Sequence, residues 1–321
     1  MKFKRLRRSW LFVNKHYMIP VILMLIAVNA ALAAGVAVFT LLVWFINVLR
    51  ARLPIDVGVS SEAETMIYKK TGSSELKLDL WKSSSGGRGS ATVVFAHGGG
   101  WVSGARSQPN NVSWCRFLAD RGLTVASIDY RFAYTHKMAD IVEDFSDAVE
   151  YVRKNADELG ISPSIILMGL SAGGHLALCH AAFNAGEAAM EDVKAVVAYY
   201  SPSDLNDLFS NEDKSFFARF GAGTALKTIP QFDEEIYKKY SPINSISAEM
   251  VPVMAVHGRK DEIVPYSSSV KLIKRLKEEG VARRFLVHKT GGHGFEVRLK
   301  DYRTTLILEE TVRFIRKAAA N

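Results

Sequence analysis

Residues 165–178 read IILMGLSAGGHLAL, and this stretch decides the fold. It begins as an apolar, strand-like run and ends in helix formers, with Ser171 enclosed between glycines. A strand that feeds a helix through so tight a turn holds its central residue in a strained conformation, and only small neighbours let the backbone turn there. The pattern therefore predicts that Ser171 is presented to a second chemical group.

Strand-like and helical stretches alternate along the rest of the chain. Residues 75–80 alternate between apolar and polar side chains and predict an early antiparallel strand with one solvent-exposed face. Further strands are predicted at residues 91–96, 123–128, 165–168, 195–199, 251–256 and 285–287. Helices are predicted at residues 140–159, 176–183, 267–279 and 305–319. Near-continuous apolar strands alternating with helices predict an α/β fold with a mostly parallel, doubly wound sheet.

The net charge of +8 comes entirely from the N-terminal end of the chain. Residues 1–52 hold eight of the 41 Lys and Arg residues and no Asp or Glu, so the remainder carries 33 basic and 33 acidic groups. The folded part is therefore neutral overall, and the basic excess is typical of a membrane flank. We expect no nucleic-acid partner.

The N-terminal segment has the composition of a membrane span. No residue from 17 to 48 is charged, and a transmembrane helix needs about 20 apolar residues. We predict a basic cytoplasmic tail at residues 1–16, a transmembrane signal anchor at 17–49, a linker at 50–60 and a folded domain at 61–321. Six basic residues precede the span and two follow it, so by the positive-inside bias the N-terminus is cytoplasmic and the folded domain extracytoplasmic.

A cleavable signal peptide is the alternative for this segment. Ala31-Leu32-Ala33 resembles a cleavage site after an apolar region. The chain stays strongly apolar for about a dozen residues beyond Ala34, so cleavage there would leave an apolar N-terminus. This continuation favours the uncleaved anchor.

Distinctive residues follow four of the predicted strands. In an open α/β sheet the carboxyl ends of parallel strands meet at one edge, where ligands bind. The segments at these ends are HGGGW at 97–101, GLSAG at 169–173, HGRKDEIVP at 257–265 and GGHGF at 291–295. A Gly-x-Ser-x-Gly motif arises easily by chance, but its position between a strand and a helix favours a nucleophile elbow over a glycine-rich connection in an inert fold.

A serine nucleophile needs a base within hydrogen-bond reach. Of the eight histidines, His293 lies on a small-residue loop after the last predicted strand, matching the chain order Ser, acid, His. His97 and His257 open glycine turns, where imidazole usually ties backbone groups together. His175, on the helix that follows the elbow, is expected to be a packing residue. His293 is therefore the predicted base.

The acid that orients the base is expected on a strand-end loop between the serine and the histidine. Asp261 meets this condition, because it follows the strand at 251–256 and precedes a turn at Pro265. Asp204 and Glu262 are its rivals. Acyl transfer also needs N–H donors for an oxyanion, which the glycines at 98–100 and the amide of Ala172 are placed to supply.

Taken together with DYR at 129–131, these segments resemble the α/β-hydrolase superfamily over about residues 60–319. Within it they are similar to hormone-sensitive-lipase-like carboxylesterases and to bacterial acetyl or feruloyl esterase-type enzymes. The resemblance implies an α/β-hydrolase fold without metal or cofactor. It implies the following roles: nucleophile Ser171, acid Asp261, base His293, and an oxyanion hole formed by the amides of Gly99, Gly100 and Ala172.

The same resemblance implies that Asp129 and Arg131 form a structural ion pair. The sequence departs from the family at Leu170, where many relatives have an acid, and at residues 132–136, which lack the usual prolines. The N-terminal apolar segment stands where relatives often have a helical cap. These departures concern the substrate more than the chemistry.

A long excursion at residues 201–249 is the predicted lid. Its aromatic residues either pack a small helical subdomain or bind an acyl chain, and the sequence leaves both open. They are Phe209, Phe216, Phe217, Phe220 and Tyr237.

The sequence thus predicts a membrane-anchored serine hydrolase that cleaves a small-molecule or lipid ester through an acyl-enzyme. The alternative is a catalytically silent adhesion or scaffolding domain on the same fold. Such domains usually lose a triad member, whereas this chain keeps a candidate for each.

Overall fold

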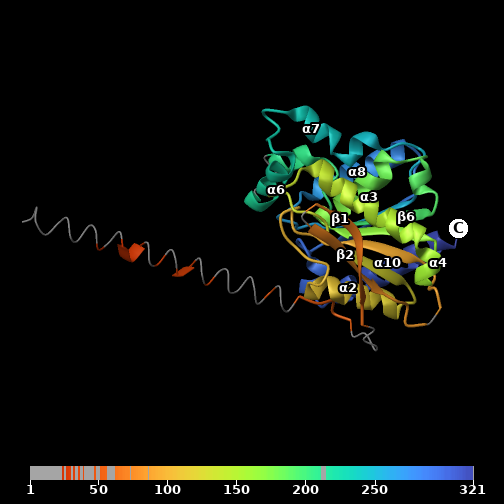
Figure 1. The fold of residues 1–321 in the computed structure, drawn as a ribbon. Helices are drawn as coiled ribbons and strands as arrows, with labels where there is room; N and C mark the ends of the chain where they lie inside the picture. The colour runs from red at the N-terminus through yellow and green to blue at the C-terminus, as the bar shows by residue number, and fades with distance from the viewer. Residues whose placement is uncertain are drawn as a thin grey trace, which may run out of the picture. The chain divides into compact units, whose positions relative to one another are not determined.

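The computed structural model describes residues 51–55, 62–72, 74–85, 87–210 and 215–320, together with a few positions between residues 24 and 47. Internal contacts divide the chain into two units, Met1–Arg50 and Ala51–Asn321. The second unit holds the sheet and its helices (Figure 1).

An eight-stranded sheet forms the centre of the second unit, in the order β1-β2-β4-β3-β5-β6-β7-β8. The strands β1 and β2 pair antiparallel, as do β2 and β4, and all other neighbours pair parallel. The strands are β1 (Glu64–Thr71), β2 (Ser74–Trp81), β3 (Thr92–Ala96), β4 (Thr124–Ile128), β5 (Ile165–Leu170), β6 (Val193–Tyr199), β7 (Val253–Gly258) and β8 (Arg283–His288). The predicted mostly parallel, doubly wound sheet is confirmed.

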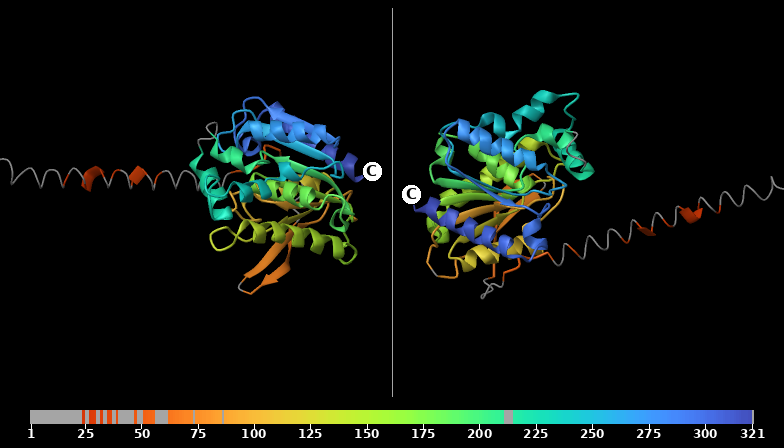
Figure 2. Two further views of the ribbon diagram at one scale, coloured as in Figure 1. Left: turned by 90° about the horizontal axis from the view of Figure 1, so that it is seen from above. Right: turned by 180° about the vertical axis from the view of Figure 1, so that it is seen from behind.

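Helices cover both faces of this sheet, as the two views of Figure 2 show. Successive strand residues point to opposite faces: in β3, Val94 belongs to one core, whereas Val93 and Phe95 belong to the other. The helices are α2 (Pro109–Asp120), α3 (Met138–Lys154), α4 (Ala156–Leu159), α5 (Ala172–Phe183), α6 (Phe216–Leu226), α7 (Glu234–Lys239), α8 (Tyr266–Glu278), α9 (Phe295–Arg298) and α10 (Tyr302–Ala319). The first core contains buried residues of α3, α5 and α8, and the second those of α2 and α10.

Two of the differences from the sequence prediction have a local physical reason. The edge strand β1 has no counterpart in the prediction, because half of its residues are exposed and it carries no apolar run. The predicted helix at 140–159 is divided at Asn155 into α3 and α4. The Asn155 side chain donates to the carbonyl of Tyr151 at 2.7 Å, which is the local competition with helix bonds that asparagine favours.

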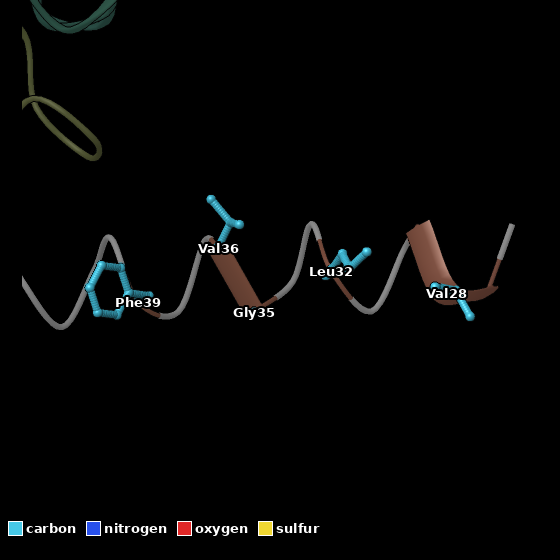
Figure 3. Close-up of a pocket in the computed structure, with 5 residues that line it drawn as sticks. All are labelled: Val28, Leu32, Gly35, Val36 and Phe39. Atoms are coloured by element: carbon cyan, nitrogen blue, oxygen red, sulfur yellow. The ribbon is translucent and has the colours of Figure 1, made fainter. Parts of the chain in front are cut away.

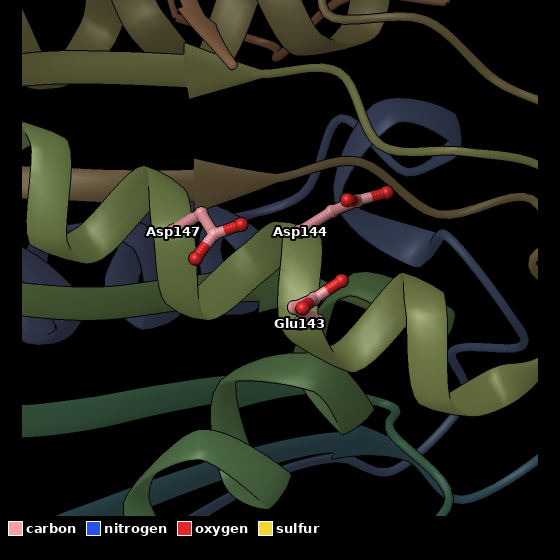
Figure 4. Close-up of side chains that lie close together, drawn as sticks. All are labelled: Glu143, Asp144 and Asp147. Carbon is pink, nitrogen blue, oxygen red and sulfur yellow. The ribbon is translucent and has the colours of Figure 1, made fainter. Parts of the chain in front are cut away.

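An ion-pair network fixes β1 and the chain after β4 to α3. Lys69 on β1 and Arg131 both contact the buried carboxylate of Asp144, at 2.8 and 2.7 Å. Glu143, Asp144 and Asp147 lie close together on α3 (Figure 4), and the two cations offset their charge. The cluster is therefore a structural one.

The predicted pair of Asp129 with Arg131 is wrong. Asp129 instead accepts from the backbone N–H of Arg106 at 3.1 Å and pairs with the Arg106 guanidinium. Arg131 turns towards α3, because three carboxylates of that helix offer its guanidinium more acceptors.

The predicted anchor at 17–49 falls mainly outside the described residues, as does the cytoplasmic tail at 1–16. Val28, Leu32, Gly35, Val36 and Phe39 are described, and Figure 3 shows them lining one shallow pocket. Their spacing of three or four places them along one side of a helix. In the part of the chain that the structure describes, no helix is both long and apolar enough to cross a membrane.

Candidate active site

The turn after β5 has the predicted strand–turn–helix geometry. Ser171 has φ 52° and ψ −116°, and α5 begins at the next residue. Neighbouring backbone leaves no room for a side chain here: a Cβ on Gly173 would overlap the carbonyl of Ala96, and a Cβ on Gly169 would overlap Gly173. The glycines are required because β3, β5 and α5 meet at this point.

The glycine loop after β3 lies against this turn. A Cβ placed on Gly98 would lie 3.4 Å from the Cβ of Ser171. Gly99 and Gly100 have φ of 124° and 59°, which favour glycine. Among the described residues, the N–H groups of Gly99, Gly100 and Ala172 donate to no protein acceptor. Three backbone donors near Ser171 are therefore available to a ligand.

His293 and Asp261 form a hydrogen-bonded pair. His293 Nδ1 lies 2.9 Å from Asp261 Oδ2 and 3.1 Å from Oδ1. Asp261 Oδ1 also accepts from the backbone N–H groups of Ile263 and Val264, at 2.8 and 2.9 Å. Burial opposes ionisation of Asp261, but the neighbouring His293 and His257 outweigh it and lower the pKa of the carboxyl below its usual range. A carboxylate in this position fixes the proton of His293 on Nδ1.

The two rival acids are used elsewhere. Asp204 caps the short helix η2 (Leu205–Phe209) by accepting from the backbone N–H of Asn206 at 3.0 Å. Glu262 pairs with Arg298 at 3.6 Å. Among the described residues, Asp261 is the one of the three candidates that bonds to His293.

Ser171 and His293 are not joined by a hydrogen bond in the described structure. Tyr200 lies between their loops: the Ser171 N–H donates to the Tyr199 carbonyl at 2.8 Å, and the Tyr200 and His293 rings are 4.5 Å apart. The structure thus brings Asp261 into contact with His293, and the glycine loop after β3 into contact with Ser171.

His175 and His97 were expected to have packing and backbone-binding roles, and their contacts agree with this. His175 Nε2 faces the Tyr240 carbonyl at 2.8 Å, and its ring lies edge-on to Trp101. Burial lowers the pKa of His175 to about 4, so this packing residue is neutral. The backbone role predicted for His97 is confirmed by its 2.7 Å contact with the Gly98 carbonyl.

His257 makes a second contact that the sequence does not predict. Its Nε2 faces both the Val264 carbonyl at 3.1 Å and Asp261 Oδ2 at 3.2 Å. Because a carbonyl only accepts, this nitrogen carries the proton and is also placed to donate to Asp261. The spacing of four between His257 and Asp261 around a turn is the signal that could have indicated the contact.

A buried pair next to His293, Tyr200 with Glu296, is also absent from the sequence prediction. The Tyr200 hydroxyl donates to Glu296 Oε1 at 2.7 Å, and both residues are buried. Tyr200 has φ 37°, an uncommon backbone conformation for an aromatic residue. Burial raises the pKa of both Tyr200 and Glu296. No residue pattern predicts this pair, because Tyr200 follows β6 and Glu296 lies at the start of α9, far away in the sequence.

The predicted lid is a helical excursion, residues 201–249, between β6 and β7, and its positions 211–214 lie outside the described residues. Its aromatic residues divide into two groups. Phe209 and Tyr237 pack edge-to-face at 5.4 Å and support the subdomain. Phe216, Phe217 and Phe220 on α6 are exposed. The packing interpretation is therefore confirmed for the first group and does not account for the second.

Named relatives and solved structures resemble the chain. Esterase LipC of Mycobacterium tuberculosis (strain ATCC 25618 / H37Rv) is 29% identical over 231 residues, covering 68% of this chain and 57% of that protein. The probable isoprenylcysteine alpha-carbonyl methylesterase ICME of Oryza sativa subsp. japonica is 31% identical over 232 residues, covering 68% and 55%. The chain spans little more than half the length of these relatives.

Esterase 2 of Thermogutta terrifontis, in its apo form, is 30% identical with a TM-score of 0.65, and the match covers 83% of this chain and 97% of that one. The same esterase is also known with butyrate bound and phosphorylated by paraoxon. The family model BD-FAE matches residues 78–276, more than half of the chain. The chain therefore belongs to the BD-FAE family, among the α/β-hydrolase esterases that its motifs resemble.

Proposed function

We propose that the protein is a membrane-anchored serine hydrolase that cleaves carboxylic esters with Ser171, His293 and Asp261. The single observation that carries this proposal is the His293–Asp261 pair, whose histidine ring lies 4.5 Å from Tyr200, the residue that follows the backbone partner of the strained Ser171. The relatives are named esterases, and Thermogutta terrifontis esterase 2 is phosphorylated by paraoxon. These matches disfavour a silent scaffolding role.

Acylation begins when His293 Nε2 removes the proton of Ser171 Oγ, which attacks the ester carbonyl. Asp261 holds Nδ1–H and stabilises the imidazolium. The charge that develops on the carbonyl oxygen is stabilised by the amides of Gly99, Gly100 and Ala172. His293 then protonates the departing alcohol. In the second half-reaction His293 takes a proton from water, which attacks the acyl carbonyl, and returns that proton to Ser171 Oγ as the carboxylic acid leaves.

This chemistry requires a hydrogen bond between Ser171 and His293 that is not formed in the structure. Catalytic hydrogen bonds are often long in a free enzyme and form only with substrate. Ser171 is 9% exposed and the His293 side chain 18%, so both remain accessible from the site. The mechanism needs this hydrogen bond to form when the substrate binds.

Labelling with a fluorophosphonate probe tests the nucleophile. The full chain should be labelled, and Ser171→Ala should not. Ser162→Ala, which changes another buried serine, is the matched control and should be labelled like the wild type. Equal labelling of Ser171→Ala would refute the proposal.

The anchor at 17–49, with a cytoplasmic N-terminus and an extracytoplasmic catalytic domain, is part of the same proposal. It is supported by the absence of charge at 17–48 and by the exposure of described apolar side chains there, such as Phe39 at 67%. Carbonate extraction should leave the full chain in the membrane. External protease should digest the catalytic domain of intact spheroplasts, and its protection would contradict the orientation.

A further inference from the structure

Four exposed aromatic residues form a contiguous surface, here called the aromatic face. Tyr134, Phe216, Phe217 and Phe220 are 59%, 79%, 42% and 41% exposed. The rings of Phe216 and Phe220 stack at 6.1 Å, and those of Phe220 and Tyr134 lie 6.4 Å apart. Single exposed apolar residues are ordinary, but a contiguous group marks a binding surface.

Helix α6, which carries three of the four aromatic residues, buries small side chains and exposes large apolar ones. In α6 the buried positions are filled mainly by small residues, whereas the large aromatic side chains point outwards. A surface helix normally buries its large apolar residues and exposes polar ones. The buried residues of α6 are Ala218, Gly221, Ala222, Ala225 and Leu226. Phe216 is the most exposed of these rings, whereas Phe217 and Phe220 are partly covered.

The aromatic face begins at the candidate oxyanion loop. A Cβ placed on Gly100 would lie 3.1 Å from the ring of Phe217, and a Cβ placed on Gly221 would lie 2.6 Å from the Gly100 carbonyl. The same loop lies against Ser171 through Gly98. One short loop thus lies against both Ser171 and α6. The rings of Phe216, Phe220 and Tyr134 contact one another on the same helix and beside it.

We propose that the aromatic face binds a long apolar chain of the ester substrate; this inference rests on the proposed function. A sugar would need polar partners between the rings. The polar side chain on α6 nearest to the rings in sequence, Arg219, is engaged with the carbonyls of Leu208 and Ser210 at 3.2 and 3.1 Å. An alkyl or isoprenoid chain needs only apolar contact, which the four rings supply.

The chain is carried by either the acyl or the alcohol part of the ester, and substrate series distinguish the two. Full-length protein in lipid nanodiscs is assayed with p-nitrophenyl acetate and decanoate, and with ethyl and decyl acetate. We expect the wild type to prefer the long chain in one series. Replacing Phe216 and Phe220 together by Ser should lower that preference about tenfold, as expected for losing contact with two or three methylene groups.

Phe232→Ser is the matched control, because Phe232 is 83% exposed on the same helical excursion and makes no ring contact among the described residues. It should keep the wild-type preference and, within about twofold, the wild-type kcat/KM for acetate. An unchanged preference in the double variant, an equal loss in the control, or a wild type without chain-length preference would overturn the inference alone.

A binding measurement separates this inference from the proposed mechanism. The Ser171→Ala variant, which should not hydrolyse esters, is titrated by calorimetry with p-nitrophenyl decanoate and with p-nitrophenyl acetate. The decanoate ester should bind, and replacing Phe216 and Phe220 should weaken its binding about tenfold. Loss of all hydrolysis in the wild type with intact decanoate binding would contradict the hydrolase proposal and leave the apolar site standing.

Discussion

The strand-end loops and the helical excursion border the same site but are built in opposite ways. The turns at the ends of β3 and β5 bring backbones into contact, and an added side chain would clash at Gly169 in β5 and at Gly173 in α5. The excursion presents large rings to solvent, and its α6 holds Gly223 with no atom closer than 3.6 Å to an added Cβ. The choice of residues in the strand-end turns is thus limited by backbone packing, whereas the choice on the exposed surface of the excursion is limited only by what that surface binds.

If the loops hold the chemistry, Ser171→Ala should have the largest effect of any single change. We expect kcat to fall by a factor on the order of 10⁴ or more, because the remaining groups only bind and polarise the ester. Circular dichroism should show an unchanged fold. Residual activity within tenfold of the wild type would place the nucleophile elsewhere.

Asp261→Asn tests the acid on the same side of the comparison. An amide cannot stabilise the imidazolium, so kcat should fall on the order of 10³-fold. Since the folded pKa of Asp261 is lowered, its contribution to stability is complete above about pH 4 and is lost as the pH falls through the folded value. The unfolding free energy of the variant should therefore depend less on pH below 4. Equal pH dependence in both proteins would show that Asp261 is not held ionised.

Two glycine substitutions compare the regions by stability alone. Gly173→Ala should lower the free energy of unfolding by about 3 kcal/mol or more, because its Cβ overlaps the Ala96 carbonyl. Gly223→Ala, in the open part of α6, should be neutral or stabilising by up to about 1 kcal/mol. Urea unfolding measures both. Similar losses in the two variants would remove the contrast between the regions.

The smallest expected effect concerns the pair behind His293. Tyr200→Phe keeps the ring beside His293 but breaks the hydroxyl bond to Glu296, and we expect kcat to fall about threefold to tenfold with KM unchanged. Tyr199→Phe removes the neighbouring buried hydroxyl, which bonds to Thr311 instead, and should leave kcat unchanged. An equal effect of both variants would indicate general loosening of the core.

The central strands could be predicted because residues buried on both faces leave an uninterrupted apolar run, as in β3 and β5. The edge strand β1 could not, since half of its residues are exposed and only one is buried. At the site, the order of Ser171, Asp261 and His293 followed from chain position. The contacts of His257 and Tyr200 did not, because they depend on how β6, β7 and β8 lie beside one another.

The contact between Gly100 and Gly221 also has a practical consequence for engineering. A Cβ on Gly221 would overlap the Gly100 carbonyl, and a Cβ on Gly100 would press on the Phe217 ring, so a substitution at either position would move the candidate oxyanion loop and α6 together. Variant libraries intended to alter substrate selectivity should therefore diversify the outward-facing positions of α6 and keep Gly100 and Gly221 fixed. Homologous helices could then be exchanged as a unit, provided that each carries glycine at the position of Gly221.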